Sequence, residues 1–262
     1  MTSRYAHILD GALAIAARAA GQLRVMQGSV LDVARKELRD VVTAADLVSE
    51  RLVLDGIRAL TPAAAILSEE AGASGVEGAT RWIVDPLDGT VNYAAGLPWF
   101  SMTLAYQEGG LTRAGVVHAP LVPLLACYAE GGVATVNGRD ARVSTRSSLS
   151  DAVVSVVLTS HFTDVEVART AEAVRRLGSR ARGVRIIVSG ALEMALVADA
   201  QLDAFVSLKA DVVSHAAAMP LVRAAGGRVT RPDGRDATDD DSERIASNGL
   251  IHDELLACLQ GL

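Results

Sequence analysis

Residues 82–93 read WIVDPLDGTVNY and join an apolar segment to a tight acidic turn. The first three residues are typical of a buried strand, and Pro86 and Gly89 favour a turn directly after it. The turn carries Asp85 and Asp88 at the strand end, where open α/β sheets bind ligands. Close carboxylates repel each other unless a cation lies between them, and oxygen ligands suit Mg²⁺, Mn²⁺ or Ca²⁺ better than zinc. For this pattern alone, an ordinary structural turn is the alternative to a metal site.

Two further apolar segments, both upstream, also end in acidic residues. Residues 65–70 read AILSEE and end in Glu69 and Glu70, and residues 41–46 read VVTAAD and end in Asp46 before a helix-like segment. All three junctions fall between residues 41 and 88, so their carboxylates can gather at one edge of a sheet. This combination favours the metal site over the ordinary turn.

These segments resemble the inositol monophosphatase family. Residues 85–93, DPLDGTVNY, are similar to its first signature, Asp-Pro-x-Asp-Gly-Thr-x-Asn-aromatic. Residues 68–70 resemble its Gly-Glu-Glu, and residues 40–46 its Asp-x-Val-Thr-x-x-Asp. Further along, residues 224–227 resemble its Glu-Ala-Gly-Gly, and residues 246–248 the strand end before its last helix. The motifs keep the family's order and similar spacing, so the resemblance covers nearly the whole chain.

The resemblance implies a hydrolase of phosphate monoesters that uses two or three Mg²⁺ ions. Its substrate would be a small phosphorylated metabolite, namely a sugar, cyclitol or nucleotide monophosphate. In this family pattern, Glu69 and Asp85 ligate the first metal with the Leu87 carbonyl, and Asp85 and Asp88 share the second. A phosphate transfer of this kind needs a cation to neutralise charge and to acidify the attacking water.

The same resemblance assigns roles around the attacking water and the phosphate. Thr90 with Glu69 would orient and deprotonate the water, and the backbone N–H groups of Gly89 and Thr90 would hold phosphate oxygens at a helix start. Asp46 and Glu70 would act near the site, through water or a weaker third ion. Family members also bring a basic residue to the site from the segment before Asp40, where this chain has Arg35 and Lys36. It is equally expected that these two side chains lie on the surface and have no role in the site.

One departure concerns the family's second signature, Trp-Asp-x-Ala. Counted back from residues 226–227, Ser214 stands where the Asp of the second metal site is expected, and a neutral hydroxyl is a poor Mg²⁺ ligand. Three interpretations stay open: Ser214 only caps a helix, Asp211 supplies the missing carboxylate, or His215 takes a role in binding substrate. The alternative function is a catalytically weakened family member that acts as a binding or regulatory protein.

The substrate is less determined than the reaction. Inositol-specific members carry a Glu seven residues before the Asp of the second signature. This chain has Ser207 at that position, which argues against plain inositol phosphate as the substrate. Ser207, Ser214 and His215 are therefore the candidate substrate contacts of the second half, beside Gly89 and Thr90 of the first.

The composition favours a protein with an aliphatic core and argues against a nucleic acid polymer or a membrane as partner. The chain has 262 residues, of which 50% are hydrophobic and only 3% aromatic, so the core must be aliphatic. A net charge of −6 argues weakly against a nucleic acid polymer as partner. Cys127 and Cys258 lie in apolar segments and read as core thiols of a reducing compartment. The amphipathic first segment and the lack of a long apolar run predict a cytoplasmic protein without a membrane partner. A homodimer is expected as well.

The pattern of apolar residues predicts two halves. Residues 1–148 form an α+β half with the metal motifs and a largely antiparallel sheet, and residues 149–262 an α/β half that completes the substrate site. The expected helices are 4–26, 44–60, 164–178, 190–200 and 214–225, and the expected strands 64–67, 81–85, 101–107, 113–119, 124–129, 152–158, 184–188 and 203–207. The resemblance implies a layered α-β-α-β-α fold of the inositol monophosphatase and fructose-1,6-bisphosphatase type. Residues 239–241, DDD, are expected in a solvated loop, with a metal role as the alternative.

Overall fold

The computed structural model describes residues 3–27, 33–35, 41–76, 78–159, 161–209 and 211–262. Lys36 and Asp40 lie outside these residues, and so does the side chain of Arg35, so the expectation of a basic group from that segment is not addressed by the structure. Over the described residues, no helix combines the length and the apolarity that crossing a membrane requires.

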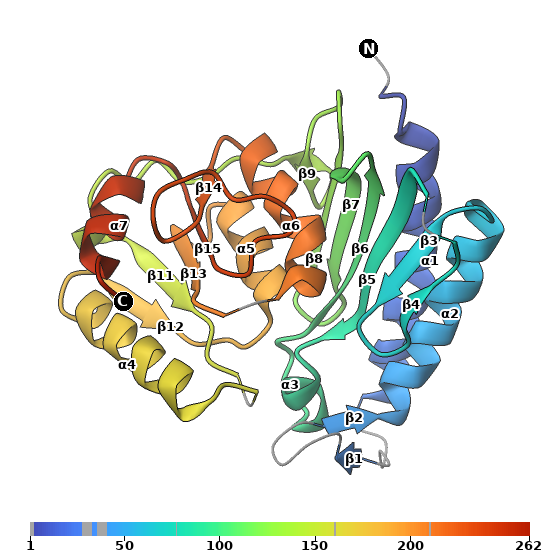
Figure 1. Ribbon diagram of the computed structural model, residues 1–262, viewed down its shortest axis with the longest axis horizontal. Coiled ribbons are helices and arrows are strands. Elements are labelled where there is room, and N and C mark those ends of the chain that lie inside the picture. The colour runs from blue at the N-terminus through green and yellow to red at the C-terminus, as the bar shows by residue number, and fades with distance from the viewer. Residues whose placement is uncertain (1–2, 28–32, 36–40, 77, 160, 210) are drawn as a thin grey trace.

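The chain folds into five layers, in the order helix, sheet, helix, sheet, helix (Figure 1). The first layer is α1 (Ala6–Met26) with α2 (Ala44–Leu60), and the last is α4 (Asp164–Gly178) with α7 (His252–Leu259). Between the two sheets lie α5 (Gly190–Ala198) and α6 (Val212–Ala224), which contact strands of both. This arrangement confirms the layered α-β-α-β-α fold expected from the sequence.

The first sheet has eight strands in the order β10-β9-β8-β7-β6-β5-β3-β4. All neighbouring pairs are antiparallel except β3 with β5. The strands are β3 (Ala65–Ser68), β4 (Gly72–Ser74), β5 (Thr80–Asp88), β6 (Ser101–Glu108), β7 (Leu111–Ala119), β8 (Leu124–Ala129), β9 (Thr135–Val136) and β10 (Arg139–Asp140). Because β3 and β5 run side by side in parallel, their acidic ends meet at one edge.

The second sheet has five strands in the order β12-β11-β13-β15-β14. The first three are parallel, and β15 and β14 are antiparallel to their neighbours. The strands are β11 (Val153–Val156), β12 (Gly183–Arg185), β13 (Ala204–Ser207), β14 (Arg228–Thr230) and β15 (Arg244–Ser247). Three smaller elements complete the chain: the hairpin of β1 (Val33–Arg35) and β2 (Val41–Thr43), the short helix α3 (Thr90–Ala94), and the 3₁₀ turn η1 (Leu149–Asp151).

Local sequence explains where the helices form. Thr163 and Glu166 make a reciprocal capping box at the start of α4, so this helix spans the expected residues 164–178. Every residue of α5 is buried, as expected of a helix that lies between two sheets and is apolar except for Glu193. The helix expected from Ser214 begins earlier, at Val212. Both cysteines are free thiols, Cys258 buried and Cys127 half-buried.

The acidic run 239–241 is only partly solvated, which corrects the expectation of a solvated loop. Asp240 is exposed, but Asp239 is 6% exposed and accepts hydrogen bonds from Gln107 Nε2 (2.7 Å), Thr112 N (2.9 Å) and Thr112 Oγ1 (2.9 Å). The carboxylate of Asp239 therefore anchors the loop before β15 to the β6–β7 hairpin of the first sheet. The sequence gives no sign of this anchor, because the partners lie more than 120 residues away.

We expect Asp239→Ala to lower the free energy of unfolding by about 3 kcal/mol, because three buried donors lose their acceptor. Asp240→Ala is the matched control and should change it by less than about 0.5 kcal/mol, since that side chain is exposed. Urea unfolding of the two variants beside the parent protein measures the difference. Equal midpoints for the two variants would show that Asp239 does not anchor the loop.

Candidate active site

A cavity of about 410 Å³ opens between the two sheets, at the ends of β3 and β5 and the starts of α3, α5 and α6. It brings together most of the residues singled out in the sequence. Those that line it are Glu69, Glu70, Asp85, Leu87, Asp88, Gly89, Thr90, Asp211, Ser214 and His215. The two halves of the chain therefore both contribute to this cavity.

A bulge and a glycine shape the end of β5 and the turn after it. The strand continues to Asp88, so Asp85 and Asp88 lie within it rather than in a turn directly after Val84, which corrects the prediction from the sequence. The pairing of β5 with β6 shifts register between Asp85 and Asp88, which places both carboxylates at the sheet edge. Gly89 follows with φ 91° and precedes α3. A Cβ on Gly89 would lie 3.0 Å from the Trp99 carbonyl oxygen and 3.1 Å from that of Val188, so this position requires glycine for its backbone angle and its space.

Asp85 is 4% exposed and both of its carboxylate oxygens are in use. Oδ1 accepts from Leu87 N (3.0 Å) and Oδ2 accepts from Ser214 Oγ (2.6 Å). Burial, followed by the negative charge of Asp88, raises the pKa of Asp85 well above its usual value, and the Ser214 hydrogen bond opposes this rise. The ionised form of Asp85 is thus unfavourable here unless positive charge is supplied.

Asp88 is held on its Oδ2 atom by three donors. These are Ser101 Oγ (3.0 Å), Ser189 Oγ (2.7 Å) and Ala191 N (3.1 Å). Burial raises the pKa of Asp88 to about 6, the Asp211 charge adds to this, and the hydroxyl donors oppose it. The roles of Ser101 and Ser189 were not foreseen, because neither belongs to a motif and Ser189 lies 101 residues from Asp88.

The Thr90 hydroxyl connects the turn to α2. Thr90 Oγ1 lies 3.1 Å from Asp46 Oδ1 and 3.0 Å from the Leu87 carbonyl oxygen, so it can donate to either acceptor. Ser49 Oγ, one helical turn after Asp46, donates to the Pro86 carbonyl (2.8 Å) and fixes α2 against the turn. Asp46 is buried, and its carboxylate contacts the Thr90 hydroxyl directly. The resemblance makes Asp46 a catalytic candidate that acts near the site, through water or a weaker third ion.

The start of α6 excludes one of the three interpretations of Ser214, namely that it only caps the helix. Asp211 is the N-cap, and its Oδ1 accepts from Ser214 N (2.9 Å). Ser214 therefore does not cap the helix; it lies in the first turn, and its hydroxyl contacts Asp85. The Asp211 charge raises the pKa values of Asp85 and Asp88, so Asp211 lies within electrostatic reach of both.

His215 and Ser207 differ in where they point. His215 is buried and lines the cavity, and burial lowers its pKa to about 4, so the imidazole is neutral near pH 7. Ser207 is buried in β13, and its hydroxyl donates to the Lys209 carbonyl (3.1 Å) rather than to the cavity. The structure therefore does not bring Ser207 to the site, contrary to the expectation of a substrate contact.

The cavity offers oxygen donors of the kind that Mg²⁺ prefers: carboxylates of Glu69, Asp85 and Asp88 and the carbonyl of Leu87. Within the described ranges, no three His, Cys, Asp or Glu side chains already form a compact ligand group. The physical argument for a cation is the adjacent pair Asp85 and Asp88, since burial and neighbouring negative charges raise both pKa values and a nearby cation would favour the ionised forms. These residues fit Mg²⁺, and Ser214 leaves one fewer carboxylate than the family pattern has.

A family model and relatives of known name match nearly the whole length of the chain. The model of the "Inositol monophosphatase family" matches residues 4–261. A Thermotoga maritima relative named "Fructose-1,6-bisphosphatase/inositol-1-monophosphatase" is 36% identical over 249 residues, which are 95% of this chain and 94% of the relative. A Pseudomonas aeruginosa relative named "Nus factor SuhB" is 30% identical over 252 residues, 94% of this chain and 93% of the relative.

Solved structures share the fold. The extragenic suppressor protein SuhB from Bartonella henselae superimposes with a TM-score of 0.92 at 29% identity, and the match covers 97% of this chain and 98% of that one. The family model and the two relatives span nearly the full length of the chain. The chain therefore belongs to the inositol monophosphatase family.

Proposed function

We propose that this protein hydrolyses small phosphate monoesters, such as a sugar, cyclitol or nucleotide monophosphate, with the help of Mg²⁺. The observation that carries the proposal is the buried pair Asp85 and Asp88 beside the hydrogen-bonded Thr90 and Asp46. Bound Mg²⁺ would neutralise charge on the phosphate and make the attacking water more acidic. The names of the relatives, which include both inositol and fructose bisphosphate phosphatases, support the same class of substrate.

The protein's own residues supply orientation and a proton acceptor. The hydrogen of the Thr90 hydroxyl is directed to Asp46 or to the Leu87 carbonyl, so the lone pairs of Oγ1 can accept a proton from a water molecule. Asp46 can receive the proton that passes through Thr90. Glu69 also lines the cavity and would help to orient and deprotonate the same water. Gly89 begins the turn into α3, where the first N–H groups lack helical partners and can bind phosphate oxygens.

Phosphate release from a panel of monoesters tests the proposal directly. The panel should contain inositol 1-phosphate, fructose 1,6-bisphosphate, histidinol phosphate and a nucleoside monophosphate, each assayed with Mg²⁺ and with excess chelator. We expect release that depends on Mg²⁺ for at least one ester. If Mg²⁺ binds and none is hydrolysed, the alternative gains support: a family member that binds or regulates without turnover. The substitution at Ser214, and the relatives named as Nus factors, favour that second candidate.

Ser214→Asp should lower the Mg²⁺ concentration needed for half-maximal activity, by roughly tenfold, because a carboxylate replaces a neutral hydroxyl beside Asp85. Asp211→Asn should raise this concentration only if Asp211 is itself a ligand. Mg²⁺ titrations of the parent protein and both variants distinguish the two roles. Coincident curves for all three proteins would show that neither residue influences the ion.

A further inference from the structure

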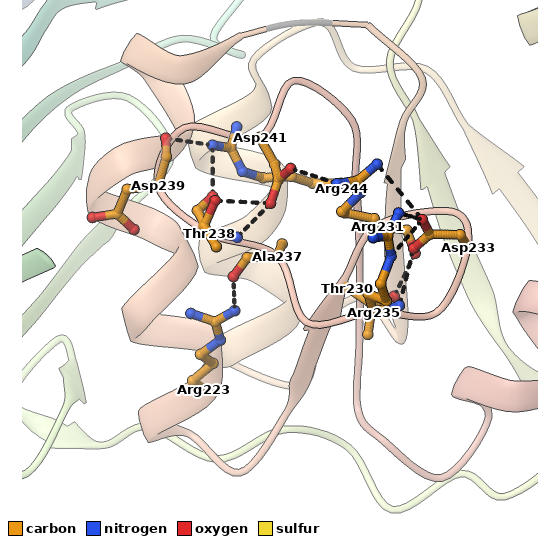
Figure 2. Close-up of polar contacts among 10 residues, drawn as sticks. All are labelled: Arg223, Thr230, Arg231, Asp233, Arg235, Ala237, Thr238, Asp239, Asp241 and Arg244. Carbon is orange, nitrogen blue, oxygen red and sulfur yellow. Dashed lines mark hydrogen bonds and ion pairs between the residues drawn. The ribbon is translucent and has the colours of Figure 1, made fainter. Parts of the chain in front are cut away.

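Glu193 is a fully buried acid in the helix between the two sheets. It lies in α5, is 0% exposed, and has no basic partner among the described residues. Another buried charged side chain, Arg244, is surrounded by acceptors: Figure 2 shows it donating to the carbonyls of Thr238 (3.4 Å) and Asp239 (3.0 Å). Its Nη1 also lies 3.2 Å from His215 Nδ1. A buried acid is just as costly unless its oxygens are used, so the partners of Glu193 indicate its role.

Both carboxyl oxygens of Glu193 bind neighbouring groups. Oε2 accepts from the backbone N–H of Ser189 (3.1 Å), and Oε1 shares a hydrogen bond with the hydroxyl of Ser155 in β11. Burial raises the pKa of Glu193 to about 8, against the effect of these hydrogen bonds, so the side chain is mostly a neutral acid at pH 7. Because Oε2 must accept from Ser189, the acid proton lies on Oε1, toward Ser155. Glu193 therefore joins β11 to the residue that precedes α5.

The segment just before α5 is held in a strained conformation. Val188 has φ 66°, which is unfavourable for a β-branched residue and persists only where the surroundings impose it. Asn92 of α3 binds the carbonyls of this segment, since its Nδ2 donates to Ile187 O (2.7 Å) and Val188 O (3.4 Å). Glu193 binds the N–H group that follows, that of Ser189. These two side chains thus fix the backbone on both sides of the strained residue.

The start of α5 supplies two of the three donors that hold Asp88. Ser189 Oγ lies 2.7 Å from Asp88 Oδ2, and Ala191 N lies 3.1 Å from the same atom. Both donors would move with the start of α5, whereas the third, Ser101 Oγ (3.0 Å), belongs to β6 and would stay. We infer that Glu193 is a positioning residue: through the start of α5 it holds the Asp88 carboxylate in place for Mg²⁺. This inference rests on the proposed Mg²⁺-dependent function.

The first test needs neither Mg²⁺ nor turnover. Hydrogen exchange of backbone amides is followed in the metal-free protein, with the amides of α7 as the internal reference. Glu193→Met keeps the length of the side chain and removes its polar atoms, so the amides of Ser189 and Ala191 should exchange at least tenfold faster than in the parent. Ala191 is decisive, because its N–H bonds Asp88 and not Glu193. Faster exchange at Ser189 alone would mean that Glu193 only satisfies its own neighbour, and would refute the inference.

The second test measures Mg²⁺ binding by calorimetry. Glu193→Met should raise the Kd for Mg²⁺ about tenfold or more, which is the usual effect of losing a group that orients a metal ligand. Glu193→Gln should stay within about threefold of the parent, because its amide can accept from Ser189 N and donate to Ser155 Oγ. Leu196→Ala, at a buried position further along α5, is the control for loss of stability alone and should leave the Kd unchanged. A Gln variant as weak as the Met variant, or an equal loss in Leu196→Ala, would overturn the inference.

Ser155→Ala covers the case in which Glu193→Met does not fold. This variant removes the hydroxyl that fixes Oε1 of Glu193. It should raise the Kd for Mg²⁺ about threefold and speed the exchange of the Ala191 amide. In that case, a Ser155→Ala protein identical to the parent in both measurements would refute the positioning role.

The two proposals can fail separately. If the parent protein binds Mg²⁺ but hydrolyses no ester of the panel, the phosphatase function is refuted, and the exchange and binding data still decide the role of Glu193. If esters are hydrolysed but neither measurement responds to Glu193→Met, the function stands and the positioning role is refuted.

Discussion

Asp85→Asn is expected to abolish Mg²⁺-dependent phosphate release, with a loss of about 1,000-fold or more. The side chain is buried next to Asp88 and is the carboxylate that both proposed metal positions share. An amide keeps the shape and removes the charge, so the attraction for both cations falls. A loss of several kcal/mol of electrostatic stabilisation corresponds to this factor, at 1.36 kcal/mol for each tenfold change.

The fold should survive this substitution. The pKa of Asp85 is raised in the folded protein, so in the metal-free state its ionisation lowers stability as pH rises through that range, and Asn removes this penalty. We therefore expect Asp85→Asn to have a Tm in chelator no lower than that of the parent, and to lose the rise in Tm that Mg²⁺ gives the parent. Asp240→Asn, at an exposed carboxylate, is the matched control for activity. Turnover of Asp85→Asn near the parent value would refute the metal assignment.

Thr90→Ala should reduce kcat by about 100-fold, because it removes the hydroxyl that is hydrogen-bonded to Asp46 and that, in the proposed mechanism, would link the attacking water to it. Glu69→Gln should reduce kcat to a similar extent if its carboxylate shares the same water. Groups that act as one unit are not additive, so the double variant should lose little more than the worse single variant. Steady-state kinetics of the three variants at saturating Mg²⁺ measure this. Losses that multiply would show that Thr90 and Glu69 act on different steps.

The parts of the site that could be predicted are those determined by residues that are neighbours in the sequence. Residues 82–90 indicate a strand and a glycine turn within nine positions, so the neighbourhood of Asp85, Asp88 and Gly89 could be predicted, whereas the bulge between Asp85 and Asp88 could not. The helix at 164–178 was equally readable, because its capping box lies in the sequence itself. The order of helices and strands indicated an α+β half and an α/β half, and the layered α-β-α-β-α fold was implied by the resemblance to the family.

The parts that could not be predicted depend on contacts between distant segments. Ser189 reaches Asp88 only because α5 lies between the sheets, and the bond from Ser214 to Asp85 joins residues 129 positions apart. The prediction that Ser207 contacts the substrate was wrong for a related reason. Counting from the second signature gives its position in the chain, but not the direction of its hydroxyl, which donates to the Lys209 carbonyl. Arg244 had no motif at all, and its contact with His215 is visible only in three dimensions.

The central helical layer has a consequence for synthesis on the ribosome. The eight-stranded sheet is complete once Asp140 has emerged, but α5 and α6, which cover its inner face, end only at Ala198 and Ala224. At about 5–20 residues per second, this aliphatic face stays bare on the nascent chain for several seconds. We therefore expect the N-terminal half to benefit from factors that shield apolar surface at the exit tunnel, and slow codons between residues 141 and 224 to lengthen its exposure to aggregation.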